Sequence, residues 1–391
     1  MDKEVIYLDN AATTKPYKEV VEIMNKYLNE EFYNPSGVYK QSQNVKKLIN
    51  ESREKLSKLI NCDSREVFFT SCGTESNNWV FKGLTENFIK NKEKNHIIIT
   101  SIEHHSILHC CEHLKKQGFE ITKLKVDSNG FINLEDLKNN ITEKTILVSI
   151  IFANNEIGVI QNIEEIGKIC KEKKVLFHSD GVQAFGHLNI DVKKLNLDFL
   201  SVSGHKFGGP KGIGFLYSNS NNKFINLENL IDGGGQEYNK RGGTENVAGI
   251  LGMVKAAEIS YSKLKENNEY LIKLRDYCIE KILKEIPESY LNGDKINRLS
   301  NNINIRFSYI EGESLILMLN KYNICCSTGS ACSSNTLEPS HVLLSIGLKH
   351  EEAHGSLRIT LNIDNTYEQI DYFIEKLKEI VSKLRQISPL K

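Results

Sequence analysis

A lysine and a carboxylate each follow a short apolar run of this sequence. Lys206 closes the segment Ser203-Gly-His205-Lys206, directly after the apolar residues 199–202. A lysine among glycines can lose enough solvation for its amine to act as a nucleophile, although most lysines are solvated surface residues. Asp180 follows the apolar residues 175–177. A carboxylate there can hold a protonated ring nitrogen, or it can simply cap a turn.

A turn of small residues follows a third apolar run, residues 67–70. This turn, Ser71-Cys-Gly-Thr74-Glu-Ser76, opens a helical pattern. Its backbone N–H groups and the Thr74 hydroxyl suit a phosphate. Taken alone, the segment fits an ordinary helix N-cap better.

The chain has nine cysteines, and no two of them have C-x-x-C spacing. This spacing excludes zinc knuckles and thioredoxin-like motifs, and free thiols in a reducing compartment are the simplest interpretation. Cys332 lies in a run of Gly, Ala and Ser, which predicts an accessible loop of the kind a reactive thiol needs. Cys325 and Cys326 follow Ile324 and are predicted to be structural.

Three other patterns imitate functional motifs. His350-Glu-Glu-Ala-His354 matches H-E-x-x-H, but Gly355 follows at once and no further ligand is near. The imidazoles of residues 104–113 share helical faces and could bind a metal, although a helix with scattered histidines is the preferred interpretation. The P-loop resemblance at residues 204–211 fails because Pro210 separates the required Gly and Lys. We therefore predict no metal site.

Short strands alternate with helices over residues 67–202, and several strand runs are apolar on both faces. This pattern is typical of a parallel sheet covered by helices on both sides, with ligands at the carboxyl ends of the strands. After about residue 250 long helices at 251–286 and 366–386 enclose short strands at 303–307 and 357–361. A second, smaller α+β domain is therefore expected.

Composition excludes several classes of protein. The 391 residues contain 50 basic and 50 acidic side chains, so the net charge is +0, which argues against direct nucleic-acid binding by bulk positive charge. No apolar run approaches the roughly 20 residues that span a bilayer. The N-terminus lacks the pattern of a signal peptide. We expect a cytoplasmic protein that does not act at a membrane.

Nine short motifs occur in a characteristic order along nearly the whole chain. They are Tyr7-Leu-Asp-Asn-Ala-Ala-Thr-Thr14, Asn34-Pro-Ser, Thr74-Glu-Ser, Glu103-His104, Asn154-Asn155-Glu-Ile-Gly158, Ser203-Gly-His-Lys206, Arg241-Gly-Gly-Thr244-Glu-Asn, Gly329-Ser-Ala-Cys332 and His354-Gly-Ser-Leu-Arg358. In this order the chain resembles the cysteine desulfurases, which are class V, fold-type I enzymes dependent on pyridoxal 5′-phosphate (PLP). The segment Leu337-Glu-Pro-Ser resembles the first group of these enzymes, in which the cysteine lies on a long loop.

The resemblance implies a fold and a domain division. The fold is α/β, PLP fold-type I: a mostly parallel seven-stranded sheet sandwiched by helices, with a smaller α+β C-terminal domain. Residues 15–257 would form the large PLP-binding domain. Residues 1–14 and 258–391 would form the small domain, which carries the cysteine loop.

The resemblance also implies roles for individual residues. Those around PLP are Lys206 as the Schiff-base lysine, Asp180 at the pyridinium nitrogen, Gln183 and Asn155 near O3′, His104 stacked on the ring and shuttling protons, and Thr74, Ser203 and His205 at the phosphate. Thr244 would reach the phosphate from the partner subunit, which implies a homodimer. Arg358 would bind the substrate carboxylate, with Asn34 near the substrate.

The implied reaction converts L-cysteine to L-alanine, with the sulfur held as a persulfide on Cys332. A sulfur-acceptor protein would then receive this sulfur for the biosynthesis of iron–sulfur clusters or of thio-cofactors and thiolated tRNA. A selenocysteine lyase, a class V aminotransferase and a non-catalytic sulfur carrier are the alternatives. Two departures from the family stand out: Gly181 replaces the usual Ala against the ring, which predicts looser packing, and the chain lacks a longer C-terminal tail, so the acceptor is open.

Overall fold

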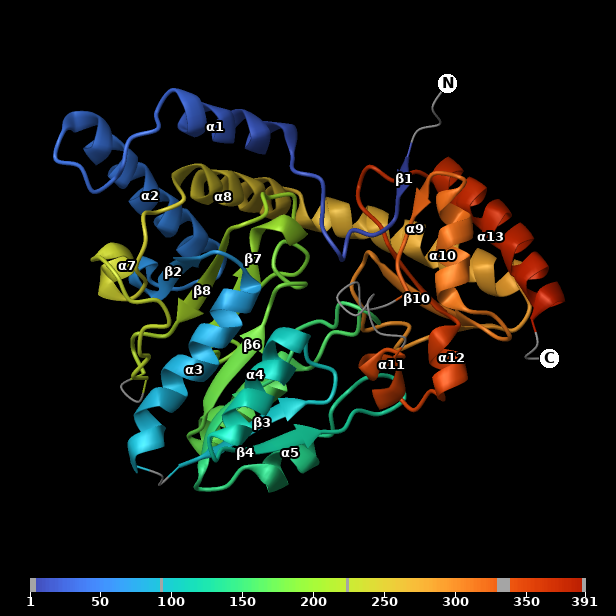
Figure 1. Cartoon of the computed structure of the whole chain (residues 1–391), viewed down its shortest axis with the longest axis horizontal. Coiled ribbons are helices and arrows are strands. Elements are labelled where there is room, and N and C mark those ends of the chain that lie inside the picture. The colour runs from blue at the N-terminus through green and yellow to red at the C-terminus, as the bar shows by residue number, and fades with distance from the viewer. Residues whose placement is uncertain (1–4, 92–93, 223–224, 329–337, 389–391) are drawn as a thin grey trace.

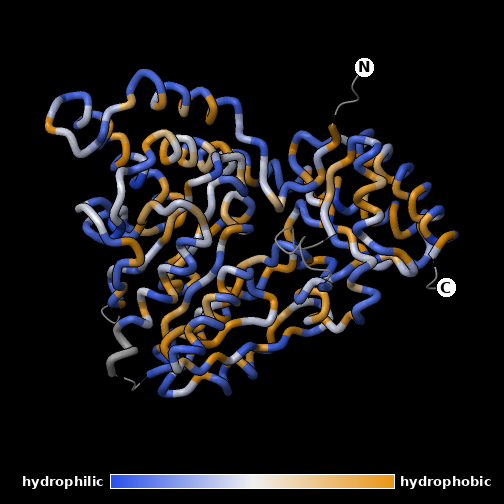
Figure 2. Tube along the Cα trace, viewed as in Figure 1, coloured by the Kyte–Doolittle hydropathy of each residue, from blue (hydrophilic) through white to orange (hydrophobic). Residues whose placement is uncertain are grey.

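The computed structural model describes residues 5–91, 94–222, 225–328 and 338–388, with the side chains of 87–91 left out. A large sheet covered by helices lies beside a smaller group of strands and helices that contains β1 and α13 (Figure 1). Hydrophobic residues concentrate along the strands, and hydrophilic ones along the outer loops (Figure 2). No helix in the described ranges is both long and apolar enough to cross a membrane.

The large sheet has seven strands in the order β2-β8-β7-β6-β5-β3-β4. Only β8 runs antiparallel to its neighbours β7 and β2. The expected strands are present, but strand β8 was not predicted. Only the 3-10 turn Gly204–Lys206 and a loop separate it from β7, because an antiparallel neighbour does not require a crossover α-helix. The strands are β2 (Val67–Thr70), β3 (His96–Thr100), β4 (Glu120–Leu124), β5 (Thr145–Ser149), β6 (Leu176–Asp180), β7 (Phe199–Ser203) and β8 (Gly214–Ser218).

Helices cover both faces of this sheet because its central strands are apolar on both sides. In β3, for example, Ile97 and Ile99 pack with helices α3 and α4, whereas Ile98 packs in the cluster that contains α2, α6 and α8. Successive strand residues point to opposite faces, so one apolar run serves two layers. The helices are α1 (Lys18–Asn29), α2 (Lys40–Leu59), α3 (Gly73–Asn91), α4 (His105–Lys116), α5 (Leu134–Asn140), α6 (Ile163–Lys173), α7 (Gln236–Asn239) and α8 (Val247–Ser262).

The smaller group has its own hydrophobic core. Ile6 and Leu8 pack there with side chains of the C-terminal third. The domain bounds, 15–257 for one domain and 1–14 with 258–391 for the other, stay a prediction. The expected helix 251–286 is two helices, interrupted at Lys263. The elements are β1 (Ile6–Tyr7), β9 (Ser289–Leu291), β10 (Asn302–Phe307), β11 (Ile324–Cys325), β12 (Ser356–Thr360), α9 (Leu264–Glu285), α10 (Gly312–Asn320), α11 (His341–Ser345), α12 (His350–His354) and α13 (Tyr367–Ile387).

The short element α7 and the residues that follow it are fixed beside the large sheet by two ion pairs. Glu237, Tyr238 and Asn239 all have positive φ, at 46°, 57° and 65°, a region that is costly for residues other than glycine. Arg53 donates to both carboxylate oxygens of the buried Glu237, at 2.7 and 2.8 Å. Two residues past Asn239, Arg241 likewise donates to Glu75 in α3 through Nε and Nη2. Glu237 also accepts the backbone N–H of Phe69 in β2. Together these contacts hold residues 237–241 against α2, β2 and α3.

Candidate active site

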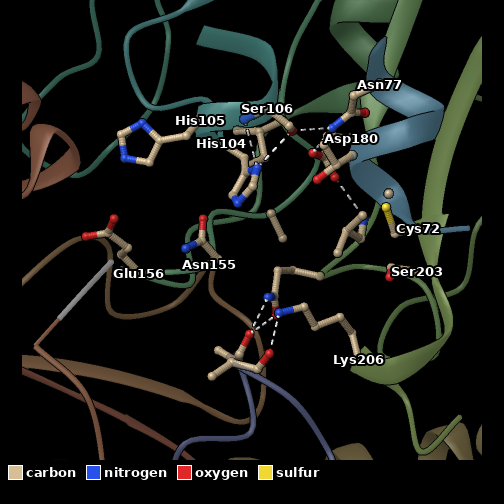
Figure 3. A pocket seen from close by; sticks show the side chains of 18 of the residues that line it. Cys72, Asn77, His104, His105, Ser106, Asn155, Glu156, Asp180, Ser203 and Lys206 are labelled. Atoms are coloured by element: carbon tan, nitrogen blue, oxygen red, sulfur yellow. Dashed lines mark hydrogen bonds between the residues drawn. The ribbon is translucent and has the colours of Figure 1, made fainter. Parts of the chain in front are cut away.

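A cavity of about 290 Å³ opens where the parallel strands of the large sheet end (Figure 3). Segments that follow β2, β3, β5, β6 and β7 line it, as expected for an open α/β sheet. Ala11, Ala12, His341 and Arg358 complete the lining from the two ends of the chain. The predicted site residues that the structure brings together here are Thr74, His104, Asn155, Asp180, Gln183, Ser203, His205, Lys206 and Arg358.

Three predicted site residues are not placed in this cavity. Asn34 is exposed, and its Oδ1 accepts a hydrogen bond from the backbone N–H of Ser36 at 2.9 Å. Thr244 is exposed in the loop before α8. Cys332 lies outside the described residues. The roles given to these three stay predictions.

Lys206 ends a short 3-10 turn that directly follows β7. Its Nζ donates to the carbonyl oxygens of Ala11 and Ala12, at 2.6 and 2.8 Å. The side-chain amide of Gln183 also donates to the Ala11 carbonyl, at 3.0 Å. The turn at Ala11 and Ala12 therefore orients the lysine through backbone carbonyls. Every residue has such a carbonyl, so residue types do not reveal these contacts.

Asp180 is the last residue of β6 and is only 4% exposed. Oδ1 accepts the backbone N–H of Val182 at 3.0 Å, and Oδ2 accepts the side-chain amide of Asn77 at 2.7 Å. Carboxylate oxygens have further lone pairs, so Asp180 can accept another N–H from the cavity. Asn77 was not predicted as a site residue, because it lies 103 positions from its partner.

His104 is the N-cap of α4, and Figure 3 shows its ring pointing into the cavity above Lys206. Its Nδ1 lies 2.8 Å from the Ser106 hydroxyl and 3.1 Å from the Ser106 backbone nitrogen. Burial lowers the pKa of His104, and the Lys206 charge adds to this, although Asp180 opposes it. The imidazole is therefore held in its neutral form at neutral pH.

The first turn of α3 offers a place for a phosphate. Thr74 belongs to this turn, and Ser203 and His205 line the same cavity. A Cβ added at Gly73 would lie 2.5 Å from Val182 Cγ2. Glycine therefore lets the backbone approach closely at a helix N-terminus, where N–H groups favour an anion. Burial, with the charges of Lys206 and Lys211, lowers the pKa of His205 to about 4. A neutral His205 can donate to a phosphate oxygen.

Arg358 lies on β12 and is 2% exposed. Its Nη2 donates to Asp9 at 2.8 Å and its Nη1 to the Asn155 carbonyl at 3.3 Å. The buried Nε has no hydrogen-bond partner among the described residues. Leaving a buried guanidinium N–H unpaired is costly, so this residue fits the binding of a small carboxylate.

Several side chains that line the cavity had no predicted role. They are Cys72, Asn77, His105, Ser106, Glu156 and His341. Glu156 could have been found, because it lies inside the motif that contains Asn155, and His105 and Ser106 follow His104 directly. Cys72 lies directly before Gly73, the first residue of α3. The count of cysteines did not distinguish it from the other cysteines of the chain.

The other sequence patterns have structural explanations. His350 and His354 lie on the five-residue helix α12, and neither lines the cavity. Across the described ranges, no group of three or more His, Cys, Asp or Glu side chains is placed to hold a metal ion. A Cβ added at Gly181 would lie 2.6 Å from Leu200 Cδ1, so this glycine lets its segment pack closely against β7, and its effect on ring packing stays a prediction.

Glu103 supports the cavity wall from the core, and its protonation predicts a pH dependence. Burial raises its pKa to about 8, against hydrogen bonds from the Thr100 hydroxyl and the Ile151 N–H. An unfolded glutamate titrates near 4.3, so between about pH 4.3 and 8 the folded chain holds a proton that the unfolded chain lacks. The free energy of unfolding attributable to this group therefore falls as pH rises.

Glu103→Gln removes that titration. We expect the melting temperature of this variant relative to that of the unmodified protein to rise steadily from pH 5 to pH 8. Differential scanning calorimetry at each pH measures the effect. Glu135→Gln, on an exposed helix face, is the control, and its difference should stay constant. A constant difference for Glu103→Gln as well would contradict the buried, protonated state.

A lysine, an aspartate and a turn suited to an anion meet at the carboxyl end of a mostly parallel sheet, and this combination is typical of the class of enzymes to which the comparisons assign the chain. Residues 6–373 match the family model "Aminotransferase class-V", and the chain belongs to that family. Within it the relatives are cysteine desulfurases, and the predicted fold and family are confirmed. "Cysteine desulfurase IscS" of Clostridium botulinum (strain Hall) is 52% identical, covering 100% of this chain and 97% of the relative.

One further relative and two solved structures agree. The protein of the same name from Methanosarcina thermophila is 51% identical, covering 100% of this chain and 95% of its own. A solved structure described as "NIFS-LIKE PROTEIN" superposes with a TM-score of 0.90 at 36% identity, covering 97% of this chain and 100% of that one. A NifS-like protein from Rickettsia africae gives a TM-score of 0.87, with 97% and 100% coverage, also at 36% identity.

Proposed function

We propose that this cysteine desulfurase uses PLP to convert L-cysteine to L-alanine and carries the sulfur as a persulfide on Cys332. The observation that carries the proposal is the meeting of Lys206, Asp180 and His104 in one cavity with a phosphate turn. When bound, PLP would act as an electron sink for a substrate attached to it. The other steps fall to side chains of this chain.

The residues present fit PLP at three points. The α3 turn with Thr74, Ser203 and His205 suits the phosphate. The free lone pairs of Asp180 suit a protonated ring nitrogen. Lys206 Nζ supplies an amine for covalent attachment. We expect Thr244 to reach the phosphate from a second copy of the chain, which supports a homodimer.

Substrate binding would rest on Arg358. Its unpartnered Nε and the terminal nitrogens of its guanidinium group can donate hydrogen bonds to the carboxylate of an amino acid. Once its amine is released, Lys206 can take the proton from the substrate Cα. Both residues line the same cavity, so one substrate can meet both.

The sulfur step balances without an external oxidant. The Cys332 thiolate attacks the substrate sulfur, and the bond between sulfur and the substrate Cβ breaks. The electron pair of that bond stays on the carbon skeleton, which takes up a proton and leaves as L-alanine. L-cysteine and one thiol thus give L-alanine and one persulfide. We propose that a cytoplasmic acceptor protein then takes the sulfur for iron–sulfur clusters or thiolated products.

The test measures products from the purified protein loaded with PLP. With L-cysteine and a thiol reductant, we expect L-alanine and sulfide in a one-to-one ratio. Without the reductant, mass spectrometry should find the additional sulfur on the peptide that contains Cys332. A keto acid in place of alanine would show an aminotransferase, and faster turnover of L-selenocysteine would show a selenocysteine lyase. Either result would overturn the proposal.

A further inference from the structure

We propose that Ser106 and Asn77 are positioning residues that keep the proton of His104 on Nε2, facing the cavity. This inference rests on the proposed function for the role of His104 in catalysis. Its structural basis is a continuous chain of hydrogen bonds from Asp180 to His104 (Figure 3). The direction of each bond in that chain can be assigned from the chemistry of the groups.

The chain starts at a group that can only accept. The Asp180 carboxylate lies 2.7 Å from Asn77 Nδ2, so this atom of Asn77 must be the donor nitrogen rather than the carbonyl oxygen. The same nitrogen lies 2.9 Å from the Ser106 hydroxyl oxygen. Both amide hydrogens of Asn77 are then in use. Asn77 Oδ1 is buried without a partner, which is consistent with an orientation set by the donor side alone.

The hydroxyl of Ser106 links Asn77 to His104 as an acceptor on one side and a donor on the other. Its oxygen accepts from Asn77, so its own hydrogen is free to donate to His104 Nδ1, 2.8 Å away. The backbone N–H of Ser106, which can only donate, points at the same Nδ1 from 3.1 Å. Two donors therefore face one ring nitrogen, and that nitrogen must present its lone pair. The neutral ring then carries its proton on Nε2.

This tautomer restricts what His104 can do in the cavity. A ring with Nε2–H offers a hydrogen-bond donor to the reacting atoms and no acceptor. Protonation at Nδ1 would place a hydrogen against the backbone N–H of Ser106 and the N-terminus of α4, which disfavours the cation. His104 would thus donate to a group in the cavity on which negative charge develops. Removal of the Cα proton would then fall to Lys206.

Nitrogen NMR tests the tautomer directly. The chain has 11 histidines, and subtracting the spectrum of a His104→Gln variant identifies His104 in the ¹⁵N-histidine-labelled, PLP-loaded protein. At neutral pH we expect a non-protonated Nδ1 and a protonated Nε2. Ser106→Ala should shift the Nδ1 resonance and raise the pKa of His104, because it removes a bond to the neutral form. Ser106→Thr should restore both.

Two further variants separate positioning from general damage. Asn77→Ala should change the His104 spectrum in the same direction, although Asn77 donates to Ser106 and not to the ring. Ser57→Ala removes a buried hydroxyl that donates only to the Glu54 carbonyl, and it should leave the spectrum unchanged. We expect Ser106→Ala to lower kcat for alanine formation about 3- to 10-fold with little change in KM, in line with loss of one hydrogen bond.

A protonated Nδ1 in the unmodified protein would overturn the inference, and so would identical His104 resonances in the protein and in Ser106→Ala. The NMR measurement needs no turnover. A protein with the expected tautomer that forms no alanine from L-cysteine would therefore refute the proposed function while supporting this assignment.

Discussion

Lys206→Ala is expected to lower the rate of alanine formation from L-cysteine by about 10⁴-fold or more. The variant loses both the amine for covalent attachment and a general base, and a positioned base alone contributes about 10²- to 10⁴-fold. Among the described residues that line the cavity, Lys206 is the only lysine. Alanine is quantified by chromatography, and the visible absorbance of lysine-bound PLP should be lost at the same time.

The matched control is Lys211→Ala. Lys211 follows Lys206 by five residues and is exposed, and it does not line the cavity. Its replacement should leave turnover within about twofold of the unmodified rate, as for most surface substitutions. Turnover by Lys206→Ala at more than a few per cent of that rate would show that another amine carries the chemistry.

Cys332→Ser is expected to reduce both persulfide formation and sulfide release to background. A hydroxyl stays protonated at neutral pH, whereas the thiolate is the nucleophile that attacks sulfur. Bound PLP should keep its absorbance, because none of the cofactor contacts proposed above involves Cys332. Mass spectrometry of the peptides after one turnover measures the persulfide, and chromatography measures alanine.

Two other cysteines serve as controls for Cys332. Burial and nearby Asp9 raise the pKa of Cys325, so its thiol stays protonated and Cys325→Ser should remain active. Cys72 lines the cavity, and Cys72→Ser tests whether it carries sulfur. Persulfide on Cys72, or full activity in Cys332→Ser, would contradict the assignment of the nucleophile.

The parts of the fold that could be predicted are those set by local pattern. Strands β5 and β7 are mostly apolar and buried along their whole length. Lys206 was found because it closely follows β7, and Asp180 because it follows the apolar residues 175–177 and ends β6. Strand β8 was not predicted, although residues 214–218 are mostly apolar; it pairs antiparallel with β7, the strand before it in the chain, and with the distant β2. Lys263 ends α8 in a sequence with no glycine or proline signal at that point.

The parts of the site that could not be predicted depend on contacts between distant residues. Asp9 pairs with Arg358 across 349 positions, and Asn77 meets Asp180 across 103. Neither spacing has a periodicity that a sequence shows. The family resemblance assigned roles to Arg358 and Asp180, but it did not reveal the partners that fix these side chains.

The fixed conformation of residues 237–241 has a consequence for the association of two copies of the chain. Their backbone is held by Arg53 and Glu75 in a conformation with three consecutive positive φ values. The conformational entropy of this segment is therefore lost when the single chain folds, before any association. Thr244, three residues beyond, is exposed on an anchored segment. If a second copy receives it, association loses less freedom than it would with a disordered arm, and preorganisation of this kind favours tighter binding.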